Sequence, residues 1–205
     1  MQVTAAHSED SLALATIHVA SWRVAYAALF PAEYLASLSV VERAKSWLAI
    51  LKARASRTLV AKRDGEILGF VSFGRSRDRD APADRGEVWA LYVSPDAWSV
   101  GAGWALWEAA RVQMLHAGYA QVSLWVLSGN VRGMRFYEAA GFVLEPNSEQ
   151  FFEHGGTTLQ EARLLFERMS AHPSVERASS GRLRLLAATP HVERQTTSGH
   201  DDVHC

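Results

Sequence analysis

Residues 87–93 predict a strand, in which a period of two places Glu87, Trp89, Leu91 and Val93 on one face and Val88, Ala90 and Tyr92 on the other. Both faces of the strand are largely apolar, which is typical of a strand buried inside a sheet. Similar runs predict further strands, and the dipeptide Asp64-Gly65 joins two of them as a tight hairpin. The expected strands lie at residues 2–6, 57–63, 66–73, 87–93, 121–127, 142–152 and 158–168.

Apolar residues spaced three and four apart predict helices between these strands. The first helix begins near Ser8, a suitable N-cap. Its inner stripe is formed by Leu14, Ile17, Ser21 and Val24. Pro31 suits the first turn of a second helix that continues to about Leu51. Two more helices are expected over residues 101–116 and 130–140, and each is followed by a glycine that can end it.

The alternation of strands and helices predicts one mixed α/β domain over residues 1–169. With 205 residues, of which 48% are hydrophobic, the chain can bury one sizeable core and is too short for two ordinary domains. Residues 170–205 are rich in Ser, Thr and Ala and show no sustained period. We therefore expect a mobile, disordered C-terminal tail.

Charge and cysteine content exclude several classes of partner. The formal net charge is -1 and no run of Lys and Arg occurs, which argues against nucleic acid. The only cysteine, Cys205, allows neither an intrachain disulfide nor a thiolate metal cluster, which fits a reducing cytoplasm. The N-terminus does not resemble a signal peptide, and no apolar run reaches membrane-spanning length, so we expect a soluble, cytoplasmic protein.

We also expect no metal site. The tail is rich in histidine, but the spacings match no known ligand set. These residues are His172, His191, His200 and His204.

The passage from the strand at 87–93 to the helix at 101–116 has the features of an anion site. The loop between them contains Gly101 and Gly103, and the first turn of a helix has main-chain N–H groups without helical partners. A phosphate or pyrophosphate group suits this arrangement. The alternative is a tight crossing of helix and strand that requires small residues.

Three segments carry a resemblance to a known family. They are LYVSP at 91–95, GAGWAL at 101–106 and SGNVRGMRFYEAAGF at 128–142, and SWRVAYAALFPAEYL at 21–35 is similar to one branch. Together they resemble the GNAT superfamily of acetyl-CoA-dependent N-acetyltransferases. The resemblance covers roughly residues 1–168. It implies a mixed, mostly antiparallel sheet with helices on both faces.

The resemblance also implies an activity, namely direct transfer of acetyl from acetyl-CoA to a primary amine of a small molecule or of a peptide or protein. No covalent enzyme intermediate is expected. Relatives often form homodimers, and no interface can be identified from this sequence. A catalytically weak, acyl-CoA-binding regulatory module with the same fold is the alternative.

The resemblance assigns the cofactor to one loop and its flanks. Main-chain N–H groups of the loop would bind the pyrophosphate, and main-chain groups of Leu91 and Val93 would pair with the pantetheine arm. Asn130 would contact the cofactor or serve only as an N-cap. Loop residues and the first helical residue after them are Trp98, Ser99, Val100, Gly101, Ala102, Gly103 and Trp104.

Two positions of this loop depart from the family pattern. Trp98 stands where the family has Arg or Gln, and Val100 stands where a second basic residue is common. We therefore expect the loop to rely on main-chain donors and to bind the cofactor more weakly than a basic loop. Trp104 is three residues from Trp107 on the expected helix, and this spacing favours packing on the sheet.

The resemblance implies two proton-transfer residues. Tyr137 matches the tyrosine that protonates the departing thiolate, and the alternative is a buried aromatic beside Phe136 and Phe142. Glu87, at the start of the central strand, is the candidate base acting through water. Its alternative is a strand-end carboxylate paired with Arg85 or another surface cation.

Aromatic residues are the candidates for the acceptor pocket. Trp22, Tyr26 and Trp89 would form its walls, although aromatic residues at helical spacing more often belong to the core. The charged run at residues 75–80 is expected to be a solvated loop, or a loop that touches a charged substrate.

Overall fold

The computed structural model of the protein describes residues 1–167. The expected tail at 170–205, the domain boundary at 169 and Cys205 lie outside the described residues. The four tail histidines named above lie there as well.

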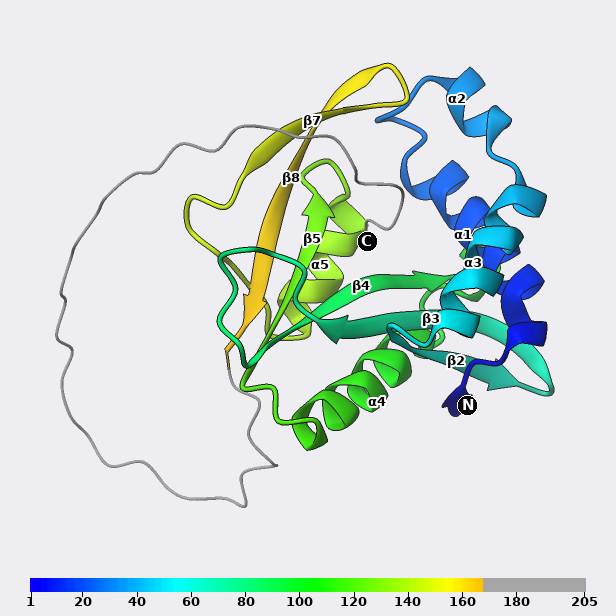
Figure 1. The fold of residues 1–205 in the computed structure, drawn as a ribbon. Helices are drawn as coiled ribbons and strands as arrows, with labels where there is room; N and C mark the ends of the chain where they lie inside the picture. The colour runs from blue at the N-terminus through cyan, green and yellow to red at the C-terminus, as the bar shows by residue number, and fades with distance from the viewer. Residues whose placement is uncertain (168–205) are drawn as a thin grey trace, which may run out of the picture.

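One mixed sheet forms the centre of the molecule (Figure 1). Its order is β1-β2-β3-β4-β5-β8-β6, and β7 also pairs with β8. Every pairing is antiparallel except that of β4 with β5. The strands are β1 (Gln2–Ala5), β2 (Arg57–Arg63), β3 (Glu66–Arg75), β4 (Arg85–Val93), β5 (Gln121–Leu127), β6 (Val143–Leu144), β7 (Gln150–His154) and β8 (Thr157–Phe166).

Helices cover both faces of this sheet, which confirms the expected fold class (Figure 1). Helices α4 and α5 contribute to the apolar layer on one face, and α1, α2 and α3 contribute to the layer on the other. Their bounds are α1 (Ser11–Ala25), α2 (Ala32–Ser37), α3 (Val40–Ala53), α4 (Ala102–His116) and α5 (Val131–Ala139).

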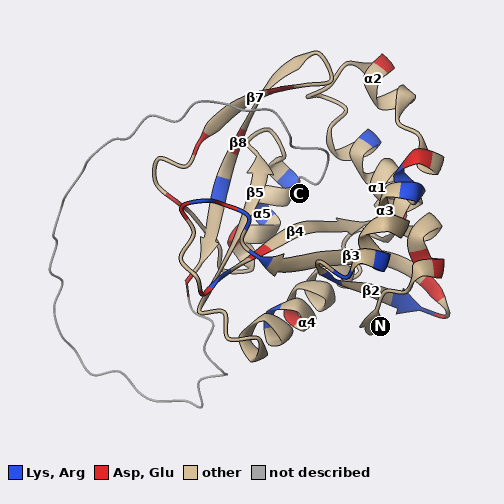
Figure 2. Ribbon diagram, viewed as in Figure 1, with Lys and Arg blue, Asp and Glu red and all other residues tan. Residues whose placement is uncertain are grey.

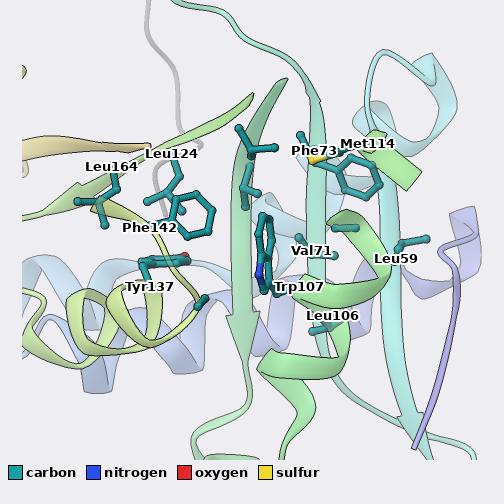
Figure 3. Close-up of a cluster of buried hydrophobic side chains, with 14 of the residues drawn as sticks. Leu59, Val71, Phe73, Leu106, Trp107, Met114, Leu124, Tyr137, Phe142 and Leu164 are labelled. Carbon is teal, nitrogen blue, oxygen red and sulfur yellow. The ribbon is translucent and has the colours of Figure 1, made fainter. Parts of the chain in front are cut away.

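The apolar residues form two clusters, one on each side of the sheet. Figure 3 shows the α4 side, where Trp107 is enclosed by side chains from the sheet and Tyr137 lies beside Phe142. The opposite cluster is dominated by aromatic rings, among them Trp22, Trp47 and Phe70. Each face of the sheet thus has its own core.

Two expected elements are broken in the structure. The helix expected from Pro31 to Leu51 is two helices, because Leu38 is extended and the Ser39 hydroxyl accepts the Glu42 N–H at 3.3 Å to start α3. The strand expected at 142–152 is also two, because Asn147 takes a left-handed φ of 59° between β6 and β7.

Two expected core positions are exposed. Val24 lies in the last turn of α1, and 51% of its surface is exposed. Trp104 is 49% exposed and does not pack on the sheet as Trp107 does. Trp104 lies in the first turn of α4, next to the cavity described below.

The sheet opens between β4 and β5. These strands pair over only three positions, from Arg85 opposite Gln121 to Glu87 opposite Ser123. Beyond them β4 continues to Val93 and β5 to Leu127 without further pairing between the two strands. The edge of β4 that faces β5 is therefore not paired with that strand at Leu91 and Val93, the two positions expected to pair with the pantetheine arm.

Candidate active site

A cavity of about 720 Å³ lies at this opening, between the end of β4, the start of α4 and the start of α5. It brings together most of the residues predicted for the cofactor. Those that line it are Leu91, Val93, Trp98, Ser99, Gly101, Ala102, Gly103, Trp104 and Asn130, together with Tyr26 and Tyr137. Among the predicted site residues, Val100, Glu87, Trp22 and Trp89 do not line this cavity.

The loop before α4 has the backbone of an anion site. Gly101 is the N-cap of α4 with a φ of 87°, and its carbonyl accepts the first helical hydrogen bond, from the N–H of Ala105 at 3.0 Å. The N–H groups of residues 102–104 are consequently not used by the helix. They lie at the positive end of a helix of 15 residues, where a negatively charged group is stabilised.

Trp98 packs across the loop instead of reaching out as a basic residue would. Its indole Nε1 donates to the carbonyl of Val93 at 2.8 Å, and the Ser21 hydroxyl donates to the same carbonyl at 3.0 Å. Both lone pairs of this carbonyl are used within the protein. The proposed contact of Val93 with a cofactor would therefore have to come from its N–H.

Two cationic residues that were not predicted from the sequence also line the cavity. Arg132 and Arg135, both on α5, face it together with the loop. Arg132 lies over the Trp98 ring, with 4.2 Å between its Cζ and the ring centroid. The expectation that this site has only main-chain donors for an anion is therefore incomplete. Arg132 follows Asn130 by two residues, and this spacing on a helix that starts at the site was the available signal.

Asn130 has the N-cap role that was left open. Its Oδ1 accepts the N–H of Gly133 at 2.9 Å and starts α5. Asn130 also lines the cavity, so a further contact with a ligand remains a proposal.

Tyr137 is both buried and in contact with the cavity. Its ring lies 5.2 Å from that of Phe136 and 5.7 Å from that of Phe142, in edge-on contacts that fix its position (Figure 3). The core environment left open as the alternative is thus present. The same residue lines the cavity, so its role as a proton donor stays a prediction beside its place in the core.

Glu87 is paired with a cation, and that cation is Arg77. Only 1% of the surface of Glu87 is exposed. Its Oε2 accepts the main-chain N–H of Arg77 at 2.8 Å, and its Oε1 accepts from the guanidinium Nε at 3.0 Å and from Nη2. Arg85 is not the cation that pairs with Glu87, because its guanidinium binds Glu145 and Gln121.

The three predicted acceptor residues do not form one wall. Trp22 and Tyr26 are buried in the aromatic cluster, where the indole of Trp22 donates to the Tyr92 hydroxyl at 2.9 Å. Trp89 lies in a different place, with its indole donating to the Arg75 carbonyl at 3.3 Å and Arg77 over its ring. Of the three, Tyr26 lines the cavity.

The charged run at residues 75–80 is exposed at Arg75, Arg77, Arg79 and Asp80, as expected of a solvated loop, and it also takes part in an ion-pair network. Figure 2 shows basic and acidic positions together where this loop meets β8. Arg163, on β8, binds Asp78 at 3.0 Å, Asp80 at 2.9 Å and a carboxylate oxygen of Glu145. The Trp125 indole also donates to Asp78 at 3.0 Å. These contacts fix the loop to the strands beside the opening.

Glu161, on β8, has an unusual proton affinity. Burial raises its pKa from 4.5 to about 7, although Gln150 donates a hydrogen bond to its Oε1 at 2.6 Å. Nearby Asp78 raises the pKa further. Glu161 as a whole is 2% exposed, so ionisation of its carboxyl above neutral pH places a charge in the protein interior.

We expect Glu161→Gln to become progressively more stabilising, relative to the wild type, as the pH rises from 4.5 to 7. The folded wild type keeps its proton over this range while the unfolded chain loses it, so wild-type stability falls. Urea unfolding gives the free energy of unfolding of the variant minus that of the wild type, and this difference should be roughly 2–3 kcal/mol larger at pH 8 than at pH 4.5. The exposed Glu149→Gln is the control, and the same difference at both pH values for Glu161→Gln would contradict the assignment.

Over residues 1–167, no group of three or more His, Cys, Asp and Glu side chains is arranged to hold a metal ion. In the same part of the chain, no helix has the length and apolar character needed to cross a bilayer.

Comparison with known families identifies an acetyltransferase family. The model of the acetyltransferase (GNAT) family matches residues 18–142. The uncharacterized N-acetyltransferase YuaI of Bacillus subtilis is 33% identical over 171 residues, which cover 82% of this chain and 94% of that protein. A mycothiol acetyltransferase of Sanguibacter keddieii is 36% identical over 89 residues, which are 43% of this chain and 28% of that protein.

Solved structures have the same fold at lower identity. An N-acetyltransferase from Staphylococcus aureus Mu50 superposes with a TM-score of 0.66 and 17% identity, over 82% of this chain and 98% of that one. The putative acetyltransferase yncA from Salmonella typhimurium, solved with acetyl-CoA, superposes with a TM-score of 0.62 and 20% identity. The match covers 86% of this chain and 98% of that one.

Proposed function

The chain belongs to the GNAT family of acetyltransferases, and from this premise we propose that it transfers acetyl from acetyl-CoA directly to a primary amine. The observation that carries the proposal is the cavity at the β4–β5 opening. It places the start of α4, two arginines and Tyr137 around one space. The phosphates of the cofactor would lie at the start of α4 and the thioester near Tyr137. Proximity of the two substrates would supply much of the rate.

The two proton transfers are assigned to Tyr137 and Glu87 in this proposal. Tyr137 would protonate the departing thiolate, and Glu87 would accept the proton of the amine through water. The ion pair with Arg77 requires an ionised carboxylate, which is also the form that can accept a proton. Trp22, Tyr26 and Trp89 remain proposed acceptor contacts.

The acceptor is proposed to be a small-molecule amine or the amino terminus of a peptide. Both classes occur among the names of similar proteins: a mycothiol acetyltransferase and a ribosomal-protein-alanine N-acetyltransferase. The purified chain should therefore be tested by thiol release from acetyl-CoA with a panel of small amines and of peptides that begin with alanine. We expect at least one class to stimulate release. Tight binding of acetyl-CoA by calorimetry without any stimulated release would favour the regulatory module instead.

We expect Glu87→Gln to lower kcat about 10- to 100-fold with the best acceptor of that panel, because the amide cannot accept a proton. The dependence of the rate on pH should also differ from that of the wild type. Arg77→Ala is the informative companion, since it breaks the same ion pair and keeps the carboxylate. If the two variants lose activity equally and keep the same pH profile as the wild type, Glu87 has a structural role only.

A further inference from the structure

Arg132 is held in place at the mouth of the cofactor loop. Its guanidinium lies over the Trp98 indole, with Cζ 4.2 Å from the ring centroid. Its Nη2 donates to the Ser99 hydroxyl at 3.2 Å. A residue of α5 is thereby fixed over the loop that precedes α4.

Trp98 is itself anchored, so it can serve as a platform. The hydrogen bond from its Nε1 to the Val93 carbonyl, at 2.8 Å, ties the indole to the end of β4. A planar guanidinium stacked on an aromatic ring loses less conformational freedom on binding an anion than a free arginine does. The stack therefore prepares Arg132 for a ligand.

Among residues 1–167, no carboxylate is paired with Arg132 to neutralise its charge. Neither Arg132 nor Arg135 forms an ion pair with a carboxylate within residues 1–167, whereas Arg77, Arg85 and Arg163 all do. Both unpaired arginines line the cavity, next to the N–H groups at the start of α4. The cavity therefore presents positive charge and main-chain donors to the same space, which suits a diphosphate.

We propose that Arg132, presented by Trp98, is the cation that binds the pyrophosphate of acetyl-CoA. The inference rests on the proposed function and deepens it. Trp98 is a platform for the cation and not a lost phosphate ligand. It follows that Trp98→Arg alone does not tighten binding, because it removes the platform and places a second guanidinium against Arg132.

The test compares two ligands that differ in their phosphates. Coenzyme A carries them, and pantetheine has the same arm without them. Dissociation constants are measured by calorimetry for coenzyme A and by NMR titration for pantetheine, with Arg132→Ala, Arg132→Lys and Trp98→Ala. Arg63→Ala is the matched control, since it removes an exposed arginine of β2 that does not line the cavity. Circular dichroism confirms that each variant is folded.

Arg132→Ala should weaken coenzyme A binding about 10- to 100-fold and leave pantetheine binding unchanged. Arg132→Lys should keep part of the affinity that Arg132→Ala loses. Adding Trp98→Ala to Arg132→Ala should weaken coenzyme A binding little further, because the two side chains act as one unit. Unchanged coenzyme A binding in Arg132→Ala, or an equal loss for pantetheine, would overturn the inference and leave the proposed function intact. A wild type that binds no coenzyme A would overturn both.

Discussion

Replacing Tyr137 with phenylalanine is expected to lower kcat by about 10²- to 10⁴-fold, the range associated with loss of a general acid. The phenol lines the cavity, and a phenol hydroxyl can donate its proton to a departing thiolate. Phenylalanine keeps the ring contacts with Phe136 and Phe142 and removes only the hydroxyl. Single-turnover release of the thiol from acetyl-CoA, with a saturating acceptor, measures the step directly.

Two comparisons separate a catalytic role of Tyr137 from a packing role: the affinity of the variant for acetyl-CoA, and the behaviour of a variant that alters only the packing. Binding of acetyl-CoA should be unchanged within about twofold, since the hydroxyl is asked to act on the leaving thiolate and not on the bound cofactor. Phe142→Leu is the matched control, because it disturbs the same cluster and leaves the phenol in place. A Tyr137→Phe variant with wild-type kcat would assign the residue to the core alone.

Arg163→Met is expected to lower the free energy of unfolding by about 3–5 kcal/mol, as is typical when one partner of a buried ion pair is removed. The guanidinium is bonded to three carboxylates, those of Asp78, Asp80 and Glu145. Methionine would leave these groups facing one another without their shared cation. Urea unfolding at pH 7 measures the difference.

The effect should depend on pH in a defined direction. The hydrogen bond to Arg163 lowers the pKa of Asp80 below its ordinary value of 3.8, so this contact stabilises the fold above that pH. The stabilisation is lost as the pH falls through the lowered pKa of Asp80. The difference in free energy of unfolding between wild type and variant should therefore become smaller below about pH 4. Arg111→Met removes an arginine whose one ion pair within residues 1–167 is with Glu108 on the same helix, and it should cost less than about 1 kcal/mol. Equal losses for the two variants would contradict the network's role.

The elements around the site were predictable from the sequence because their signals are local. The hairpin at Asp64-Gly65 forms as expected, with a φ of 52° at Asp64 and 84° at Gly65. Gly101 and Asn130 cap the two helices that border the cavity. The break before α3 also had a local signal, since Ser39 and Glu42 have the spacing of a capping box.

The pairing of charges was not predictable in the same way. Arg132 meets Trp98, and Arg163 meets Asp78, only because separate strands and helices are brought together by the sheet. A single sequence does not specify which cation pairs with which carboxylate across such distances. Glu87 illustrates the limit: a cationic partner was foreseen, and its identity as Arg77 depends on how the loop after β3 turns back over β4.

The three-residue pairing of β4 with β5 gives the protein an internal edge strand, and this has a consequence for amide exchange. The main-chain N–H groups of Leu91 and Val93 lie beyond the part of β4 that pairs with β5, so they should take up deuterium faster than N–H groups that are bonded to β3. A pantetheine arm that joins the sheet as an added strand would slow that uptake. Deuterium exchange along β4 can therefore report whether the opening is filled before any acceptor amine has been identified.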